Sequence, residues 1–195
     1  MNTQAAAHPG GAPRFARGPA PLLLGMVLFI ASETMFFGAL FGAYFTLRGE
    51  TAVWPPAGAR LDLVEMSIAT AILLGSSVPA HLAAHALRDG APAAAVRRLL
   101  LAAVMGVAFL GLKLHDWATA GFSVASHAYG TIFFTLTGFH ALHMVAGVIL
   151  LAGLAAKVAG GHLRPETGGA DAVIYYWHFV DAVWLAVFST IWLIR

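Results

Sequence analysis

Cysteine is missing from this sequence: none occurs among its 195 residues. Disulfide bonds, thiolate metal sites and cysteine nucleophiles are therefore excluded. Charged residues are also scarce, at 10% of the chain against about 25% in an average soluble domain. Hydrophobic residues make up 59%, which is more apolar surface than the polar groups of such a chain could cover in water. The sequence therefore predicts a protein whose main solvent is the lipid bilayer.

Long apolar runs account for this composition. A helix needs about 20 mostly apolar residues to cross a bilayer. Five segments meet that requirement: 21–47, 64–87, 96–117, 128–158 and 172–194. The connecting segments carry helix-breaking clusters of Gly and Pro. We predict an all-α fold, a polytopic membrane bundle of five transmembrane helices over 21–195, preceded by a disordered tail over 1–20.

The net charge is +2 and the pI is near 9.3. We attribute this basic character to loops and not to a nucleic-acid-binding surface, because the basic residues lie between the apolar runs. Short loops rich in Lys and Arg stay in the cytoplasm. An N-in, C-out arrangement puts more basic residues inside (Arg14, Arg17, Arg88, Arg97, Arg98, Lys157, Arg164) than outside (Arg48, Arg60, Arg195). The same arrangement predicts aromatic belts inside (Tyr175, Tyr176, Trp177) and outside (Trp54, Trp117, Trp192).

The first run carries Gly38 and Gly42, a Gly-x-x-x-Gly pattern that favours close packing between helices. At 100° per residue both glycines lie roughly opposite Glu33. We therefore expect this helix to have neighbours on two sides.

Ionisable residues also occur within the apolar runs. Glu33 and Asp181 fall near the middle of their helices, where inserting a charged group costs about 2.5–3.5 kcal/mol. Four further pairs share a helix face at a spacing of three or four residues: His81 with His85, Lys113 with Asp116, His140 with His143, and His178 with Asp181.

Three interpretations of these residues are open. A metal or haem site would use His140 and His143, but a four-coordinate metal needs more ligands than this pair. A proton or solute path would use the mid-membrane carboxylates. Polar contacts between helices would fix the register of the bundle. We favour the third interpretation, because the sequence contains no complete ligand set.

Three motifs carry a resemblance to a known family. Residues 28–37 read LFIASETMFF, residues 130–143 read GTIFFTLTGFHALH, and residues 176–185 read YWHFVDAVWL. In this order they resemble subunit III of the haem-copper respiratory oxidases, from about Leu22 to the C-terminus. The positions that match the family's intramembrane polar residues are Glu33, His140, His143, His178 and Asp181.

The resemblance implies a non-catalytic role in a proton-pumping oxidase. The chain would pack directly beside subunit I, which holds the haems and copper and reduces oxygen to water, in a complex with subunit II and a small subunit IV. It would hold no haem, copper or other metal itself. It would stabilise the core, support proton uptake and bind membrane lipids such as phospholipid, and it would have no nucleic-acid partner.

The sequence departs from the familiar family pattern in its number of helices and at single positions, among them Ala69, where the family has Asn. Seven helices are usual, and this sequence begins at what would be the third. Five-helix forms are familiar in prokaryotic oxidases, so we expect a prokaryotic cell membrane. A family element with Glu reads here as residues 113–117, with Asp116 in its place.

Other functions remain open beside the oxidase subunit. An accessory subunit of nitric oxide reductase would come from the same superfamily. A stand-alone transporter would show paired repeats and broken helices, and the sequence has neither. The electron donor of the oxidase, cytochrome c or quinol, is also left open.

Overall fold

The computed structural model describes residues 21–163 and 168–194. These residues form five long helices: α1 (Pro21–Glu50), α2 (Leu63–Arg88), α3 (Pro92–Thr119), α4 (Ala128–Ala159) and α5 (Gly169–Phe188). α5 continues into a short π-helical segment, η2 (Ser189–Leu193). Each long helix has the length and hydropathy needed to cross a membrane. The prediction of an all-α protein with five spans is therefore confirmed, while the predicted tail over 1–20 lies outside the described residues.

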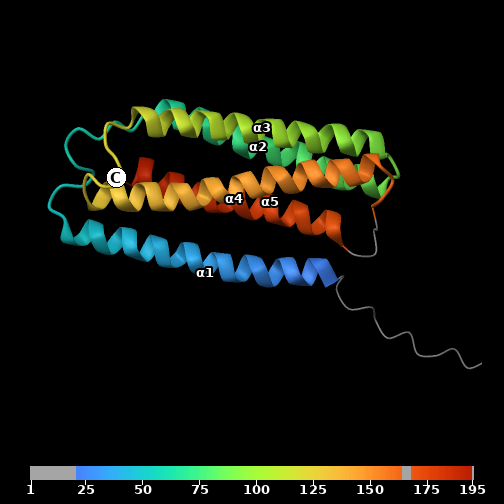
Figure 1. Cartoon of the computed structure of the whole chain (residues 1–195), viewed down its shortest axis with the longest axis horizontal. Helices are drawn as coiled ribbons and strands as arrows, with labels where there is room; N and C mark the ends of the chain where they lie inside the picture. The colour runs from blue at the N-terminus through green and yellow to red at the C-terminus, as the bar shows by residue number, and fades with distance from the viewer. Residues whose placement is uncertain (1–20, 164–167, 195) are drawn as a thin grey trace, which may run out of the picture.

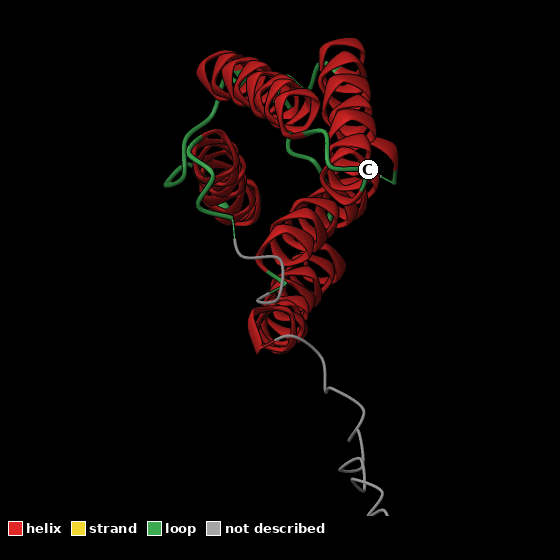
Figure 2. Ribbon diagram, turned by 90° about the vertical axis from the view of Figure 1, so that its right-hand side faces the viewer, coloured by secondary structure: helices red, strands yellow, loops and turns green. Residues whose placement is uncertain are grey.

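The five helices run side by side along the long axis of the molecule, as Figure 1 shows. α2 and α3 form one edge, α4 and α5 lie in the middle, and α1 forms the opposite edge. In the described part of the chain every regular element is helical (Figure 2), and the loops lie at the two ends of the bundle (Figure 1). α1 packs mainly against α4 and α5, so much of its surface faces away from the rest of the chain.

The helix boundaries follow local signals. Asp62 caps α2 by accepting a hydrogen bond from the Glu65 backbone N–H (2.9 Å). α3 begins at Pro92, four residues before the predicted start of this span. The first turn of a helix tolerates Pro because its missing N–H has no partner there in any case. The preceding turn depends on Gly90, whose φ of 70° suits glycine better than any other residue.

Tryptophan forms the centre of the bundle. Trp177, Trp184 and Trp192, all from the C-terminal part of the chain, are almost fully buried. The prediction that Trp177 and Trp192 belong to aromatic belts at the membrane surfaces is therefore wrong, and so is that for Tyr176, which is also buried. Their side chains fill the space between α5 and its neighbours, a role that hydropathy along the chain does not distinguish from an interfacial one.

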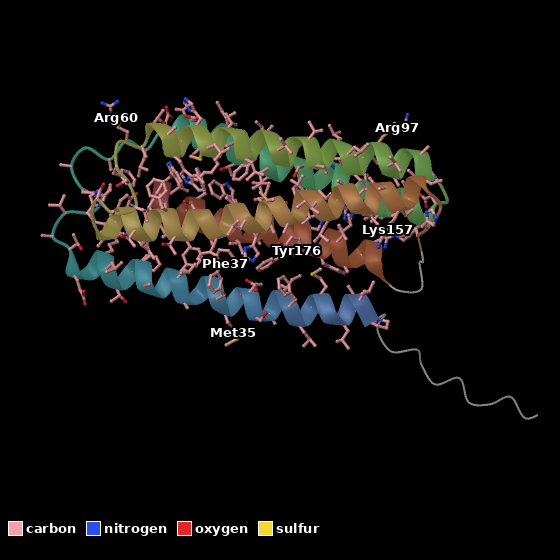
Figure 3. The ribbon with its side chains drawn as sticks, in the orientation of Figure 1. Met35, Phe37, Arg60, Arg97, Lys157 and Tyr176 are labelled. Carbon is pink, nitrogen blue, oxygen red and sulfur yellow. The ribbon has the colours of Figure 1, made fainter. Side chains whose placement is uncertain are left out.

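The Gly-x-x-x-Gly pattern of α1 faces outward. Apart from the adjacent residues and the backbone of α1 itself, no atom of the described residues would lie within 4 Å of a Cβ added at Gly38 or Gly42. The second neighbour expected for α1 is thus not supplied by this part of the chain. Figure 3 shows the inner and outer faces of α1 at two labelled side chains: Phe37 points toward α4 and α5, while Met35 points away from the bundle.

Basic residues lie at the two ends of the bundle. Arg60 lies at the end formed by the α1–α2 and α3–α4 loops, and Arg97 and Lys157 lie at the other end (Figure 3). The long apolar stretch between these ends is the part of the molecule that the hydrocarbon core of a bilayer would cover.

Candidate functional site

Glu33 of α1 bonds directly to His143 of α4. The Glu33 Oε2 and His143 Nε2 atoms are 3.0 Å apart, in a partly buried position. His143 Nδ1 lies 2.8 Å from the Phe139 carbonyl oxygen, which can only accept, so Nδ1 carries a proton. The pair then shares one further proton, held either by the carboxyl group or by Nε2. The structure therefore brings these two predicted residues together in a hydrogen bond that links α1 to α4.

Asp181 and His178 of α5 both bond to one hydroxyl group on α2. Ser77 Oγ lies 2.9 Å from His178 Nδ1 and donates a hydrogen bond to Asp181 Oδ2. Asp181 is buried, and its second carboxyl oxygen, Oδ1, has no hydrogen-bond partner among the described residues. Two turns along α2, His81 and His85 lie with their Nε2 atoms 3.1 Å apart.

Lys113 and Asp116 form the ion pair that their spacing on α3 predicts. The Nζ and Oδ2 atoms are 2.6 Å apart, and both side chains are almost inaccessible to solvent. The ammonium group also lies 4.7 Å from the ring centre of Phe133 and 4.6 Å from that of Trp192. A buried cation gains stabilisation from aromatic faces at such distances. This cluster joins α3, α4 and η2 at the end of the bundle opposite the α2–α3 loop.

His140 does not share a site with His143. It points into the bundle, with its ring centre 5.0 Å from that of Trp184 and 6.0 Å from that of Phe109. Both of its nitrogens are buried without a hydrogen-bond partner in the described part of the chain. The i, i+3 spacing on α4 therefore places His140 in the core and His143 against α1.

Further hydroxyl groups on α2 fix the register of α5. Trp177 Nε1 donates to Ser76 Oγ and Trp184 Nε1 donates to Thr70 Oγ1, each at 2.9 Å. Sequence reasoning did not single out Thr70, Ser76 or Ser77. The adjacent pair of serines in an otherwise apolar run was the available signal, since hydroxyl side chains often bond between membrane helices.

The structure brings the predicted residues into several separate contacts rather than one centre. Over residues 21–163 and 168–194, no group of three or more His, Asp or Glu side chains is arranged to hold a metal ion. His143 is engaged with Glu33, and His178 with Ser77. What this arrangement can do chemically is to hold helices in register and to pass protons between neighbouring polar groups.

Comparison with known proteins decides the family. The family model described as cytochrome c oxidase subunit III matches residues 16–194. The chain belongs to the cytochrome c oxidase subunit III family. The resemblance inferred from the three motifs is thereby confirmed, as is the assignment to a multi-pass membrane protein.

Relatives from distant organisms support the family. The cytochrome c oxidase subunit 3 of Thermostichus vulcanus is 34% identical over 175 residues, covering 88% of this chain and 87% of the relative. A probable cytochrome c oxidase subunit 3 of Mycobacterium leprae is 35% identical over 182 residues, covering 91% and 90%. The cytochrome c oxidase subunit 3 of Branchiostoma lanceolatum is 38% identical over 176 residues, covering 86% of this chain and 67% of the relative.

Proposed function

We propose that the chain is the non-catalytic subunit III of a proton-pumping haem-copper terminal oxidase in a prokaryotic cell membrane. It packs directly against subunit I, within a complex that also contains subunit II and a small subunit IV. Its own contribution is to stabilise the catalytic core and to support proton uptake. Membership of the cytochrome c oxidase subunit III family supports the proposal at its coarsest level.

One structural observation carries the finer proposal. The polar residues at membrane depth are used in contacts from helix to helix: Glu33 with His143, and Ser77 with His178 and Asp181. Such contacts make a rigid, apolar bundle that can sit beside another membrane protein. The outward face of α1, with Gly38 and Gly42, offers a surface on which a partner helix can approach closely.

Phospholipid is proposed as a further partner. A cavity of about 640 Å³ lies between α1, α4 and α5. Its wall is mostly apolar, with Leu22 and Met26 from α1 and Leu154 from α4, and Lys157 is among the lining residues. Apolar walls suit acyl chains, and an ammonium group near the membrane surface suits a phosphate. Lys157→Gln is expected to lower the phospholipid that copurifies with the complex.

The test is purification of the complex through a tag on this chain. We expect copurifying subunits that carry haem and copper, oxygen consumption, and proton release after reconstitution. A complex that instead reduces nitric oxide would reassign the chain as an accessory subunit of nitric oxide reductase. Purification without any haem protein would overturn both and favour a stand-alone membrane protein.

A further inference from the structure

A strip of polar side chains runs along one face of α2. Ser77, His81 and His85 follow one another at a spacing of four residues, which aligns them on one side of a helix. His81 and His85 are exposed on the surface of this chain, although both lie within the span. Arg88, at the end of α2, continues the face to the end of the bundle. Imidazoles at membrane depth are uncommon and usually mark an ion or proton pathway.

Neighbouring members of the strip are hydrogen-bonded, except His81 and His178, whose rings lie side by side without a direct bond. His85 Nε2 and His81 Nε2 are 3.1 Å apart. The ring of His178 on α5 lies next, with its centre 6.3 Å from that of His81. From His178 Nδ1 a bond of 2.9 Å leads to Ser77 Oγ, which donates to Asp181 Oδ2. Every member can both give and take a proton, as a relay requires.

The serine determines the direction of the inner bonds. Its hydroxyl group has one proton and gives it to Asp181, so it accepts the Nδ1 proton of His178. If His178 takes a further proton at Nε2, its Nδ1 proton can move to Ser77 while the Ser77 proton moves to Asp181. The imidazole is then neutral and the carboxyl group is protonated. One proton has been delivered, and no bond between heavy atoms has changed.

The strip ends at Asp181, inside the bundle. Its side chain is buried, and the Oδ1 atom has no hydrogen-bond partner among the described residues. Two groups of α2 face this end of the strip. The imidazole of His81 lies beside His178, and the hydroxyl group of Ser77 bonds to Asp181. On the side of α1 and α4, Glu33 and His143 are bonded to each other and meet α5 through Tyr176, whose hydroxyl donates to the His143 carbonyl.

The other polar clusters differ from this strip. Lys113 and Asp116 form a closed pair inside the bundle, without an exposed member. Glu33 and His143 are likewise paired with each other. The α2 strip alone among these three has exposed members toward the membrane surface and a buried carboxyl group at its far end.

We propose that His85, His81, His178 and Ser77 carry protons from the membrane surface at the Arg88 end of α2 to Asp181, which stores one proton inside the bundle. The proposal deepens the support of proton uptake named above and rests on it for its physiological purpose. The loading of Asp181 is a property of this chain and can be measured independently.

The experiment follows the protonated carboxyl group by infrared spectroscopy. The purified complex in lipid nanodiscs is shifted from alkaline to neutral pH, and the carbonyl stretch that disappears in Asp181→Asn identifies Asp181. We expect His81→Ala to slow the appearance of this band by about tenfold or more, a rate factor equivalent to about 1.4 kcal/mol in the barrier. Imidazole added to the buffer should restore the rate, because the position of His81 is exposed.

His115→Ala is the matched control, since His115 is an exposed imidazole on α3 that bonds to Glu65 and lies off the strip. Its loading rate should equal that of the parent protein. The proposal would be overturned if the Asp181 band appeared in His81→Ala as fast as in the parent protein, or if no band could be assigned to Asp181.

A second variant covers the case in which His81→Ala does not assemble. His81→Gln keeps a polar side chain that cannot titrate and should show the same slow loading of Asp181. If no haem protein copurifies, the proposed function fails, while the chain alone in nanodiscs still decides whether Asp181 loads.

Discussion

Single side chains in this bundle act as connectors between helices. Glu33 and His143 illustrate the principle, because the Phe139 carbonyl fixes the proton on Nδ1 and leaves Nε2 for the carboxyl group. The contact therefore needs one proton between two partners, and an amide can supply it as well as a carboxyl group can. This distinguishes a connector from an obligatory proton relay, which needs a group that changes its charge.

Glu33→Gln is predicted to leave an assembled complex with most of its initial activity. The amide N–H of the new side chain can donate to His143 Nε2, so the link between α1 and α4 is kept. Glu33→Ala should weaken retention of the subunit in detergent, since it leaves Nε2 of the partly buried His143 without its partner, at a cost of about 1–3 kcal/mol. Oxygen consumption, proton release and subunit stoichiometry measure both effects. A fully assembled Glu33→Gln complex with activity reduced about a hundredfold, equivalent to about 2.7 kcal/mol, would make Glu33 a relay.

The buried pair of Lys113 and Asp116 predicts strong coupling. Lys113→Met should destabilise the chain by about 3–5 kcal/mol, because it leaves the Asp116 carboxyl group buried without its partner. The double variant Lys113→Met with Asp116→Leu should lose far less, since no unpaired charge remains. Thermal unfolding in detergent of the two single variants and the double variant measures the coupling. Additive losses would show that the pair is not the source of the stability.

At the scale of elements, α3, α4 and α5 meet around one indole ring. A Cβ added at Gly106 of α3 would lie 2.6 Å from Trp177 Cη2, and one added at Gly147 of α4 would lie 2.9 Å from Trp177 Cε3. Both distances are shorter than van der Waals contact. Glycine at these two positions therefore makes room for Trp177 and allows three helices to approach closely.

Gly106→Ala and Gly147→Ala are each predicted to destabilise the bundle by about 1–3 kcal/mol, the usual effect of overpacking a core. Gly111→Ala is the control on the same helix as Gly106, because nothing lies within 4 Å of a Cβ at that position. Its stability should be unchanged or slightly raised. Unfolding temperatures in one detergent provide the measurement, and equal losses at all three positions would contradict the packing around Trp177.

The whole molecule has two chemically different ends. Arg88, Arg97 and Lys157 lie near the end where α2 passes into α3 and where α4 finishes. Arg48 and Arg60 belong to the other end, near the C-terminus. The positive-inside rule predicts that the more basic end stays in the cytoplasm. The prediction of an N-in, C-out topology applies this rule to the bundle.

Cysteine probes on the cysteine-free chain test the topology. Asp89→Cys and Ala57→Cys place exposed thiols in loops at opposite ends of the bundle. An impermeant thiol reagent applied to intact cells should label the Ala57→Cys variant and spare the Asp89→Cys variant. Labelling both after permeabilisation is the control for reactivity. The opposite pattern in intact cells would reverse the orientation.

Composition, hydropathy and motifs were enough to predict the class, the number of spans and the family. Hydropathy is summed over about 20 residues, so it reports reliably that a segment prefers lipid. The pairing of Lys113 with Asp116 was also predictable, because oppositely charged side chains at i, i+3 lie within reach of each other on one helix and attract. The three collinear motifs predicted the family, which the comparisons confirm.

The packing of the bundle, and not the sequence pattern, shows which helix faces which. It placed Trp177 and Trp192 in the core rather than at a membrane surface, separated His140 from His143, and turned Gly38 away from the other helices. It also brought Ser77 to His178 and Asp181 across about a hundred residues of sequence. The physical reason is that lipid and a neighbouring helix are equally apolar, so hydropathy cannot tell them apart, and contact depends on the rotation of each helix about its axis.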